Sequence, residues 1–129
     1  MIDDYAHHPN ELKYAIETAR SLYPNEKIMA VFQPHLYSRT ADFYREFAHA
    51  LSTLDEIWLM PIYPAREKEI EGVRSEMIFN LITSDHKQIV EAASLVEKLK
   101  NESTAKVIMT LGASDIDKFH KEILSVIRK

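Results

Sequence analysis

Residues 27–32 read KIMAVF, a short and almost unbroken apolar run. Such a run is typical of a parallel strand that is covered on both faces of its sheet, because neither face then meets water. Two later segments have the same character: EIWLMPI at residues 56–62 and KVIMTLG at residues 106–112. We expect these three segments to be the central strands of a buried sheet.

Amphipathic helices alternate with these strands. Pro9 suits the first turn of a helix, where its missing N–H group is not needed. The apolar residues after it recur at helical spacing, namely Leu12, Ala15, Ile16, Ala19 and Leu22. A second helix is expected from about Ser38, with an apolar side made of Phe43, Phe47, Ala50, Leu51 and Leu54.

The rest of the chain continues the alternation. We expect a short helix through Met77, Ile78 and Leu81, and Ile2–Asp3 as the end of a further strand. The remaining expected elements are a minor strand at 87–91, a helix at 92–100 and a closing helix at 116–127. Alternating strands and helices predict an α/β fold with a mostly parallel sheet and helices on both faces.

The composition excludes several classes of protein. The 129 residues carry a formal charge of −4 without a basic stripe, so we expect no nucleic-acid partner. The absence of cysteine excludes disulfides and thiolate metal sites and fits a reducing compartment. No apolar run approaches the ~20 residues that span a bilayer, so we expect no membrane partner. With only two glycines, the chain has no glycine-rich phosphate loop.

The chemically interesting side chains follow the predicted strands. In open α/β sheets ligands bind beyond the carboxyl ends of the strands, so we expect these side chains along one edge. Helix N-termini at that edge would offer free N–H groups to anions. The residues are Asp4, His7, His8, His35, Tyr37, Arg39, Tyr63, Arg66, Ser114 and Asp115.

Simpler interpretations remain open at the first motif. Asp4 could cap the first helix or the turn before it. His7 and His8 are adjacent and point in different directions on any regular element, so they make a poor metal pair. One of them could bond a nearby backbone carbonyl. We therefore predict no metal site.

Arg39 is unusual because it stands at the start of a helix, where the helix dipole disfavours a cation. A carboxylate held by Arg39 and by backbone N–H groups would resolve this conflict. The simpler alternative is a surface ion pair with Asp42.

Other candidates have ordinary structural interpretations. Ser114 and Asp115 suit an N-cap pair for the last helix, and Arg66 with residues 67–69 suits a solvated loop. No nucleophile elbow, serine–histidine–acid order or metal triad is present, so no residue is assigned a catalytic role.

Four segments in this order resemble the C-terminal domain of the Mur ligases, in particular those that join L-alanine to UDP-N-acetylmuramate. They are DDYAHHPNEL, FQPHLYSRT, YPAREKEIEGVRS and LGASDI, and they extend over essentially the whole chain. The resemblance implies a Rossmann-like three-layer domain over residues 1–129. It also implies an N-terminal UDP-sugar domain and a central P-loop ATPase domain, which this sequence does not contain.

The resemblance also implies a reaction. ATP phosphorylates the lactyl carboxylate of UDP-N-acetylmuramate, and the amine of L-alanine attacks the acyl phosphate through a tetrahedral intermediate. Mg²⁺ neutralises the phosphates and is held mainly by the central domain. The C-terminal domain closes over the central one and is inactive alone. The implied setting is peptidoglycan precursor synthesis in the bacterial cytoplasm.

Residue roles follow from the matching motifs. The resemblance places Asp4 at the ATP ribose and His7 near the nucleotide. His35 and Arg39 would face the incoming amino acid, with Tyr37 and Arg66 as weaker candidates.

Two positions depart from the family pattern. Leu36 stands where arginine is common, so a positive contact is lost or is replaced by Arg66. Ser114 stands where the family often has glycine, which casts doubt on a tight backbone approach at that turn. Two alternatives therefore stay open: the related ligase that reattaches recycled murein tripeptide, and a stand-alone α/β binding module.

Overall fold

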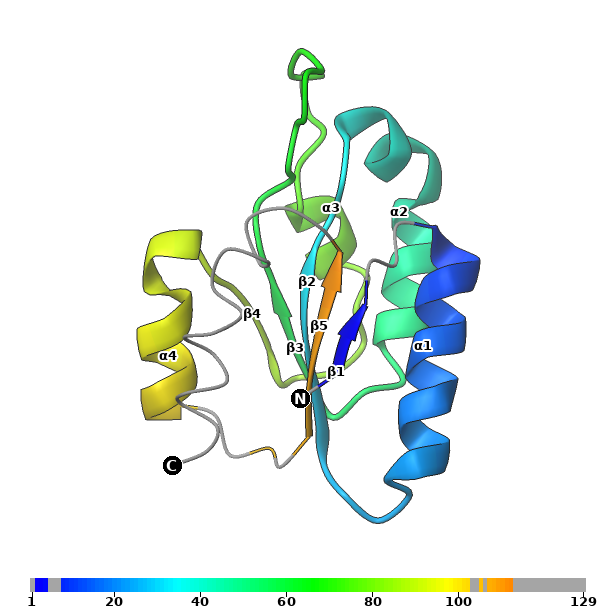
Figure 1. The fold of residues 1–129 in the computed structure, drawn as a ribbon. Helices are drawn as coiled ribbons and strands as arrows, with labels where there is room; N and C mark the ends of the chain where they lie inside the picture. The colour runs from blue at the N-terminus through cyan, green and yellow to red at the C-terminus, as the bar shows by residue number, and fades with distance from the viewer. Residues whose placement is uncertain (1, 5–7, 103–104, 106, 113–129) are drawn as a thin grey trace.

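The computed structural model describes residues 2–4, 8–102, 105 and 107–112. Within these residues, strands and helices alternate as expected (Figure 1). The elements in chain order are β1 (Ile2–Asp4), α1 (Pro9–Leu22), β2 (Ile28–Gln33), α2 (Tyr37–Leu51), β3 (Glu56–Leu59), α3 (Glu76–Phe79), β4 (Lys87–Ile89), a 3₁₀ turn (Ala92–Ser94), α4 (Leu95–Glu102) and β5 (Val107–Gly112).

The five described strands form one sheet in the order β1-β5-β2-β3-β4, and every pair is parallel. β2 lies at the centre and is the strand expected from KIMAVF, shifted by one residue. All six of its residues are buried, as are all six of β5. The parallel α/β architecture is therefore confirmed.

Two apolar clusters cover the two faces of the sheet, and alternate residues of β2 contribute to each. Ile28, Ala30 and Phe32 face α1 and α2, while Met29 and Val31 face the layer that contains α4. Figure 1 shows α1 and α2 together on one side of the sheet and α4 on the other. This arrangement gives the three expected layers. The helix expected at 116–127 lies outside the described residues.

Helix α1 begins and ends as its spacing predicts, but its last apolar residue does not join the core. Leu12 and Ile16 are buried, whereas Leu22 is 64% exposed. Leu81 is also 45% exposed, because α3 ends at Phe79, before that position is reached. Leu22 is the last residue of α1 and Leu81 lies two residues after the end of α3, so the helical spacing does not place either side chain in the core.

Strand β3 is shorter than the apolar run EIWLMPI predicts. It ends at Leu59, and Pro61 has no N–H group to continue the ladder. Extended pairing resumes at a single parallel bridge between His35 and Tyr63. The loop that follows Tyr63 extends beyond the carboxyl end of the sheet (Figure 1). Its base is anchored by buried Ser75, whose hydroxyl donates to the Met60 carbonyl.

Candidate functional site

The carboxyl ends of β1, β5 and β2 lie side by side. Asp4 pairs with Leu111 in the β1–β5 ladder, and Leu111 pairs with Phe32 in the β5–β2 ladder. Gln33 pairs with Gly112, one position further along. The first motif and the segment after β2 therefore meet at one edge of the sheet, as the sequence predicts. His7, Ser114 and Asp115 lie outside the described residues.

The next predicted residue, His35, is held by the loop after β3. The His35 ring stacks on Tyr63 with ring centroids 5.8 Å apart and an interplanar angle of 16°. Two backbone hydrogen bonds join the same segments: Tyr63 N–H donates to the Pro34 carbonyl at 2.8 Å, and Leu36 N–H donates to the Tyr63 carbonyl at 2.9 Å. His35 is therefore placed by two segments that are far apart in the sequence.

Arg39 lies in the first turn of α2, one helical turn after His35. Its Nη1 is 3.4 Å from His35 Nδ1, and both side chains are partly buried. The structure therefore brings the two predicted substrate residues together. The salt bridges found between described residues do not include the alternative pair of Arg39 with Asp42.

The N-terminus of α2 is already occupied by a carboxylate of the same chain. Ser38 N–H donates to Glu67 Oε1 at 3.1 Å, and Ser38 Oγ donates to Glu67 Oε2 at 2.5 Å. These bonds, the Ser38 hydroxyl first and the backbone N–H second, lower the pKa of the Glu67 carboxyl. Arg66, Lys68 and Glu69 are exposed, as a solvated loop predicts, but Glu67 also makes two hydrogen bonds to Ser38 that the sequence does not predict.

The N-terminus of α1 is capped by His8. Its Nδ1 accepts from Asn10 N–H at 3.2 Å, and Glu11 Oε1 accepts from His8 N–H at 3.0 Å. The pair forms a capping box with Pro9 in the first turn. The His8 ring also packs edge-on against Phe43 of α2, at 4.9 Å between centroids. The His8 ring thus accepts a hydrogen bond from a backbone N–H, whereas the simpler interpretation had one histidine bonded to a backbone carbonyl.

These caps answer one alternative and correct one expectation. The N-cap of the first helix is His8 and not Asp4, while the turn before it lies outside the described residues. The helix N-termini were expected to offer free N–H groups to anions, but those of Asn10 and Ser38 are bonded to His8 and Glu67. These two N–H groups are therefore available to an anionic ligand only if their present bonds break.

The two weaker candidates, Tyr37 and Arg66, belong to the two segments that meet at this cluster. Tyr37 lines a small hollow of about 220 Å³ at the carboxyl end of β3 and β4, together with Arg74 and Glu91. Arg66 is exposed in the loop after β3, next to Glu67. The structure thus brings Tyr37 close to the predicted edge and leaves Arg66 on an exposed loop.

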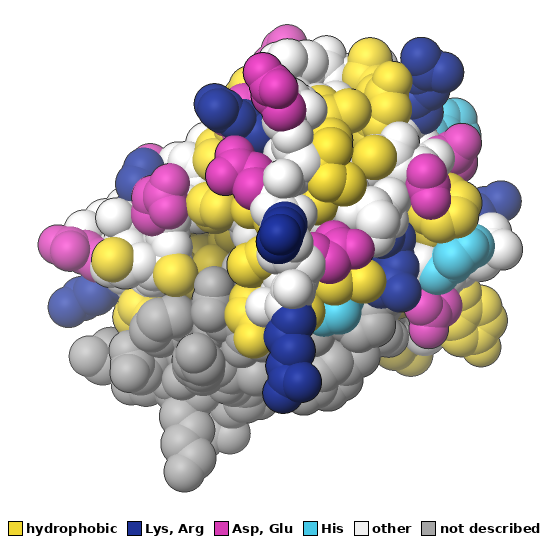
Figure 2. All heavy atoms as spheres, turned by 90° about the horizontal axis from the view of Figure 1, so that it is seen from above, with side chains coloured by type: hydrophobic (Ala, Val, Ile, Leu, Met, Phe, Trp, Pro, Cys, Tyr) yellow, Lys and Arg dark blue, Asp and Glu magenta, His cyan; other side chains and the backbone are white. Residues whose placement is uncertain are grey.

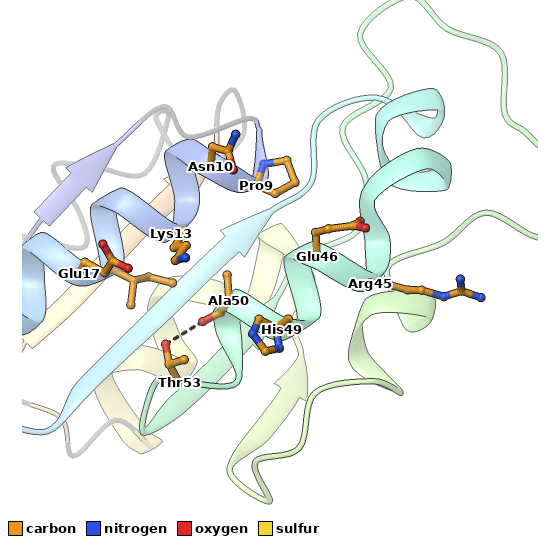
Figure 3. Close-up of a pocket in the computed structure, with 10 residues that line it drawn as sticks. Pro9, Asn10, Lys13, Glu17, Arg45, Glu46, His49, Ala50 and Thr53 are labelled. Atoms are coloured by element: carbon orange, nitrogen blue, oxygen red, sulfur yellow. Dashed lines mark hydrogen bonds between the residues drawn. The ribbon is translucent and has the colours of Figure 1, made fainter.

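A larger groove of about 460 Å³ lies elsewhere, between α1 and α2 (Figure 3). Side chains of both helices line it, among them Lys13, Glu17, Arg45 and His49. None of the predicted substrate residues belongs to its lining. Figure 2, which looks down on the carboxyl edge of the sheet, shows basic, acidic and histidine side chains mixed among apolar ones, without a large field of one sign.

The backbones of β2 and β5 approach closely at this edge. Gly112 has φ +92°, and a Cβ atom placed on it would lie 2.2 Å from the Gln33 carbonyl oxygen. The backbones of β5 and β2 are thus in close contact at Gly112, while Ser114, where the family often has glycine, lies outside the described residues.

The described residues contain no group of three His, Asp or Glu side chains that could hold a metal ion. None of the helices among them is long and apolar enough to cross a membrane.

Comparison with known proteins agrees with this geometry. Residues 1–114 match the family model "Mur ligase, glutamate ligase domain". The chain is 51% identical over 118 residues to the UDP-N-acetylmuramate–L-alanine ligase of Porphyromonas gingivalis. The aligned stretch covers 92% of this chain and 26% of that protein. It is 45% identical over 130 residues to the ligase of the same name from Phocaeicola vulgatus, covering 100% of this chain and 28% of the relative.

Solved structures share the fold. The UDP-N-acetylmuramate–alanine ligase of Thermotoga maritima matches 96% of this chain and 25% of its own, with a TM-score of 0.72 and 25% identity. A murein peptide ligase from Psychrobacter arcticus has a TM-score of 0.70 at 16% identity, covering 95% of this chain and 26% of its own. The chain thus spans about a quarter of the length of these relatives. The chain belongs to the Mur ligase family, as a glutamate ligase domain.

Proposed function

We propose that this chain is the substrate-closing domain of an ATP-dependent ligase that joins L-alanine to UDP-N-acetylmuramate. The observation that carries the proposal is the convergence of Asp4, His35 and Arg39 on one edge of the sheet. The identity of about half the residues to alanine-adding relatives supports the choice of substrate.

In this proposal the edge has two functional parts. Asp4, at the end of β1, accepts hydrogen bonds from the two ribose hydroxyls of ATP, and His7 lies on the same side of the nucleotide. A carboxylate suits this role because it offers two acceptor oxygens to paired donors. The chain has no glycine-rich phosphate loop, so the triphosphate is held by the central domain.

The second part binds the amino acid. Arg39 carries the fixed positive charge that pairs with the alanine carboxylate, and a guanidinium suits a carboxylate because it can donate two parallel hydrogen bonds. The His35 ring lies beside it, 3.4 Å from Nη1. Since Ser38 N–H already bonds to Glu67, Arg39 supplies most of the recognition.

The chemistry requires the whole ligase. The lactyl carboxylate attacks the γ-phosphorus of ATP and releases ADP. The amine of alanine then attacks the acyl carbon, loses a proton and releases phosphate. Because no metal cluster lies among the described residues, Mg²⁺ in this proposal is held by the central domain. This domain therefore contributes binding and closure, and it is inactive alone.

The proposal, which places the enzyme in the bacterial cytoplasm, is tested with the complete three-domain ligase. Purified enzyme is given ATP, Mg²⁺ and UDP-N-acetylmuramate with either L-alanine or the L-alanyl-γ-D-glutamyl tripeptide, and the UDP-linked product and phosphate are measured. We expect product with L-alanine and little with the tripeptide. Preferential use of the tripeptide would support the recycling ligase, and no product with either would refute both ligase functions.

A further inference from the structure

The loop after β3 is joined to the start of α2 at two places, one at Tyr63 and one at Glu67. We call this contact between residues 34–38 and residues 63–67 the clamp. Backbone hydrogen bonds of 2.8 and 2.9 Å connect Tyr63 to Pro34 and Leu36. The Glu67 carboxylate completes the clamp at the far end, on the N–H and hydroxyl of Ser38.

The backbone of the clamp is strained on both sides. Leu36 has φ 74° and Ala65 has φ 53°, and they are the only non-glycine residues with positive φ in the described part of the chain. Such conformations cost about 1–3 kcal/mol each and persist only where surrounding contacts enforce them. The turn of Ala65 is closed by Glu67 N–H, which donates to the Pro64 carbonyl at 2.9 Å. The contacts of Glu67 therefore help to hold the backbone in these strained conformations.

We propose that Glu67 is a positioning residue: by bridging the loop to Ser38, it holds His35 and Arg39 in the orientation that binds the amino acid. The inference rests on the proposed function, because it assumes that Arg39 faces alanine. The geometry supports it directly. Arg39 follows Ser38 in the chain, and the His35 ring stacks on Tyr63 while its Nδ1 lies 3.4 Å from Arg39 Nη1.

A competing interpretation makes the opposite prediction. Glu67 could occupy the place of the substrate carboxylate, so that alanine must displace it. The clamp explains more of the structure, because the carboxylate is joined to two donors of Ser38 and its backbone closes the turn at Pro64. If Glu67 positions Arg39, its removal weakens alanine binding; if it competes, its removal strengthens that binding.

The kinetic test uses the complete ligase with Glu67→Ala, Glu67→Gln and the control Glu69→Ala, an exposed glutamate of the same loop. Glu67→Ala should raise the KM for L-alanine on the order of tenfold, since a displacement of about 1 Å near a reacting centre can cost up to ~100-fold. The KM for ATP should change much less. Glu67→Gln keeps an acceptor for Ser38 N–H and should lie between Glu67→Ala and the unchanged enzyme.

Three kinetic results would overturn the inference: a lowered alanine KM in Glu67→Ala, an unchanged one, or an equal effect of Glu69→Ala. Arg39→Ala separates this failure from that of the proposed function. If Arg39→Ala raises the alanine KM and Glu67→Ala does not, only the positioning role fails. If Arg39→Ala itself leaves the alanine KM unchanged, the proposed function fails.

Amide hydrogen exchange measures the clamp without catalysis. In the 129-residue chain, Glu67→Ala should speed exchange of the Leu36 and Tyr63 amides about tenfold, because local opening becomes easier. Amides in β2 should keep their rates, which shows that the variant is folded. Leu36 and Tyr63 amides that exchange as slowly in Glu67→Ala as in Glu69→Ala would refute the clamp.

Discussion

Replacing Gly112 by alanine tests the packing of the edge on which the site is built. Gly112 ends β5 with φ +92°, and its new Cβ atom would lie 2.2 Å from the Gln33 carbonyl oxygen. That oxygen belongs to the backbone of the central strand, so it cannot rotate away as a flexible side chain could. The contact is relieved only if β5 and β2 separate at their carboxyl ends.

The expected loss has two contributions. A side chain at positive φ costs about 1–2 kcal/mol, and relief of an overpacked contact typically costs a further 1–3 kcal/mol. Gly112→Ala should therefore lower the free energy of unfolding by about 2–5 kcal/mol, a large part of the ~5–15 kcal/mol typical of a domain.

Gly72 provides a matched control for the first contribution. It has φ +82°, but nothing lies within 4 Å of its added Cβ atom. Gly72→Ala should therefore cost only the ~1–2 kcal/mol of the backbone conformation. Urea denaturation of both variants and the unchanged chain at 25 °C, followed by circular dichroism, gives the three free energies. Equal losses in the two variants would refute the close approach of β5 to β2.

Three further predictions concern individual contacts. His8→Ala should lower the free energy of unfolding by about 1 kcal/mol through loss of the N-cap, while His8→Asn should restore most of it; equal stability of both variants would contradict the cap. Ser75→Ala should cost about 1–3 kcal/mol in urea denaturation, because it leaves the Met60 carbonyl without its buried donor, and a loss no larger than that of the partly exposed Ser84→Ala would argue against this bond. Because the pKa of Glu67 is lowered in the folded chain, the unchanged chain should have a larger free energy of unfolding than Glu67→Gln above the ordinary glutamate pKa of about 4.3. This difference should disappear as the pH falls through the lowered pKa. A difference that persists in acid would contradict the Ser38 bonds.

Much of the fold could be predicted because burial leaves a local pattern. KIMAVF predicts β2 to within one residue, since a central parallel strand needs apolar side chains on both faces. The end of β3 was less predictable. Its apolar run continues past Leu59, but Pro61 removes an N–H group and the chain rejoins the sheet edge only at Tyr63.

Part of the candidate site could be predicted, because strand order and helical spacing determine which residues lie near one another. Strand order brings Asp4 and His35 to the same edge, and helical spacing brings Arg39 beside His35. The contact of Glu67 with Ser38 could not be predicted, because the two residues are 29 positions apart in the chain. His8 is not among the residue types that most often cap helices, although Glu11 three positions later is the second half of a capping box.

The measurement that tests the central claim most directly is a crossed comparison of KM values in the complete ligase. Asp4→Ala should raise the KM for ATP more than that for alanine. Arg39→Ala should raise the KM for alanine at least about tenfold, which corresponds to ~1.4 kcal/mol, and change that for ATP less. Arg45→Ala, on the exposed side of the same helix, serves as the control and should change neither. If Asp4→Ala and Arg39→Ala instead alter the same KM, or alter none, the two-part substrate edge is contradicted.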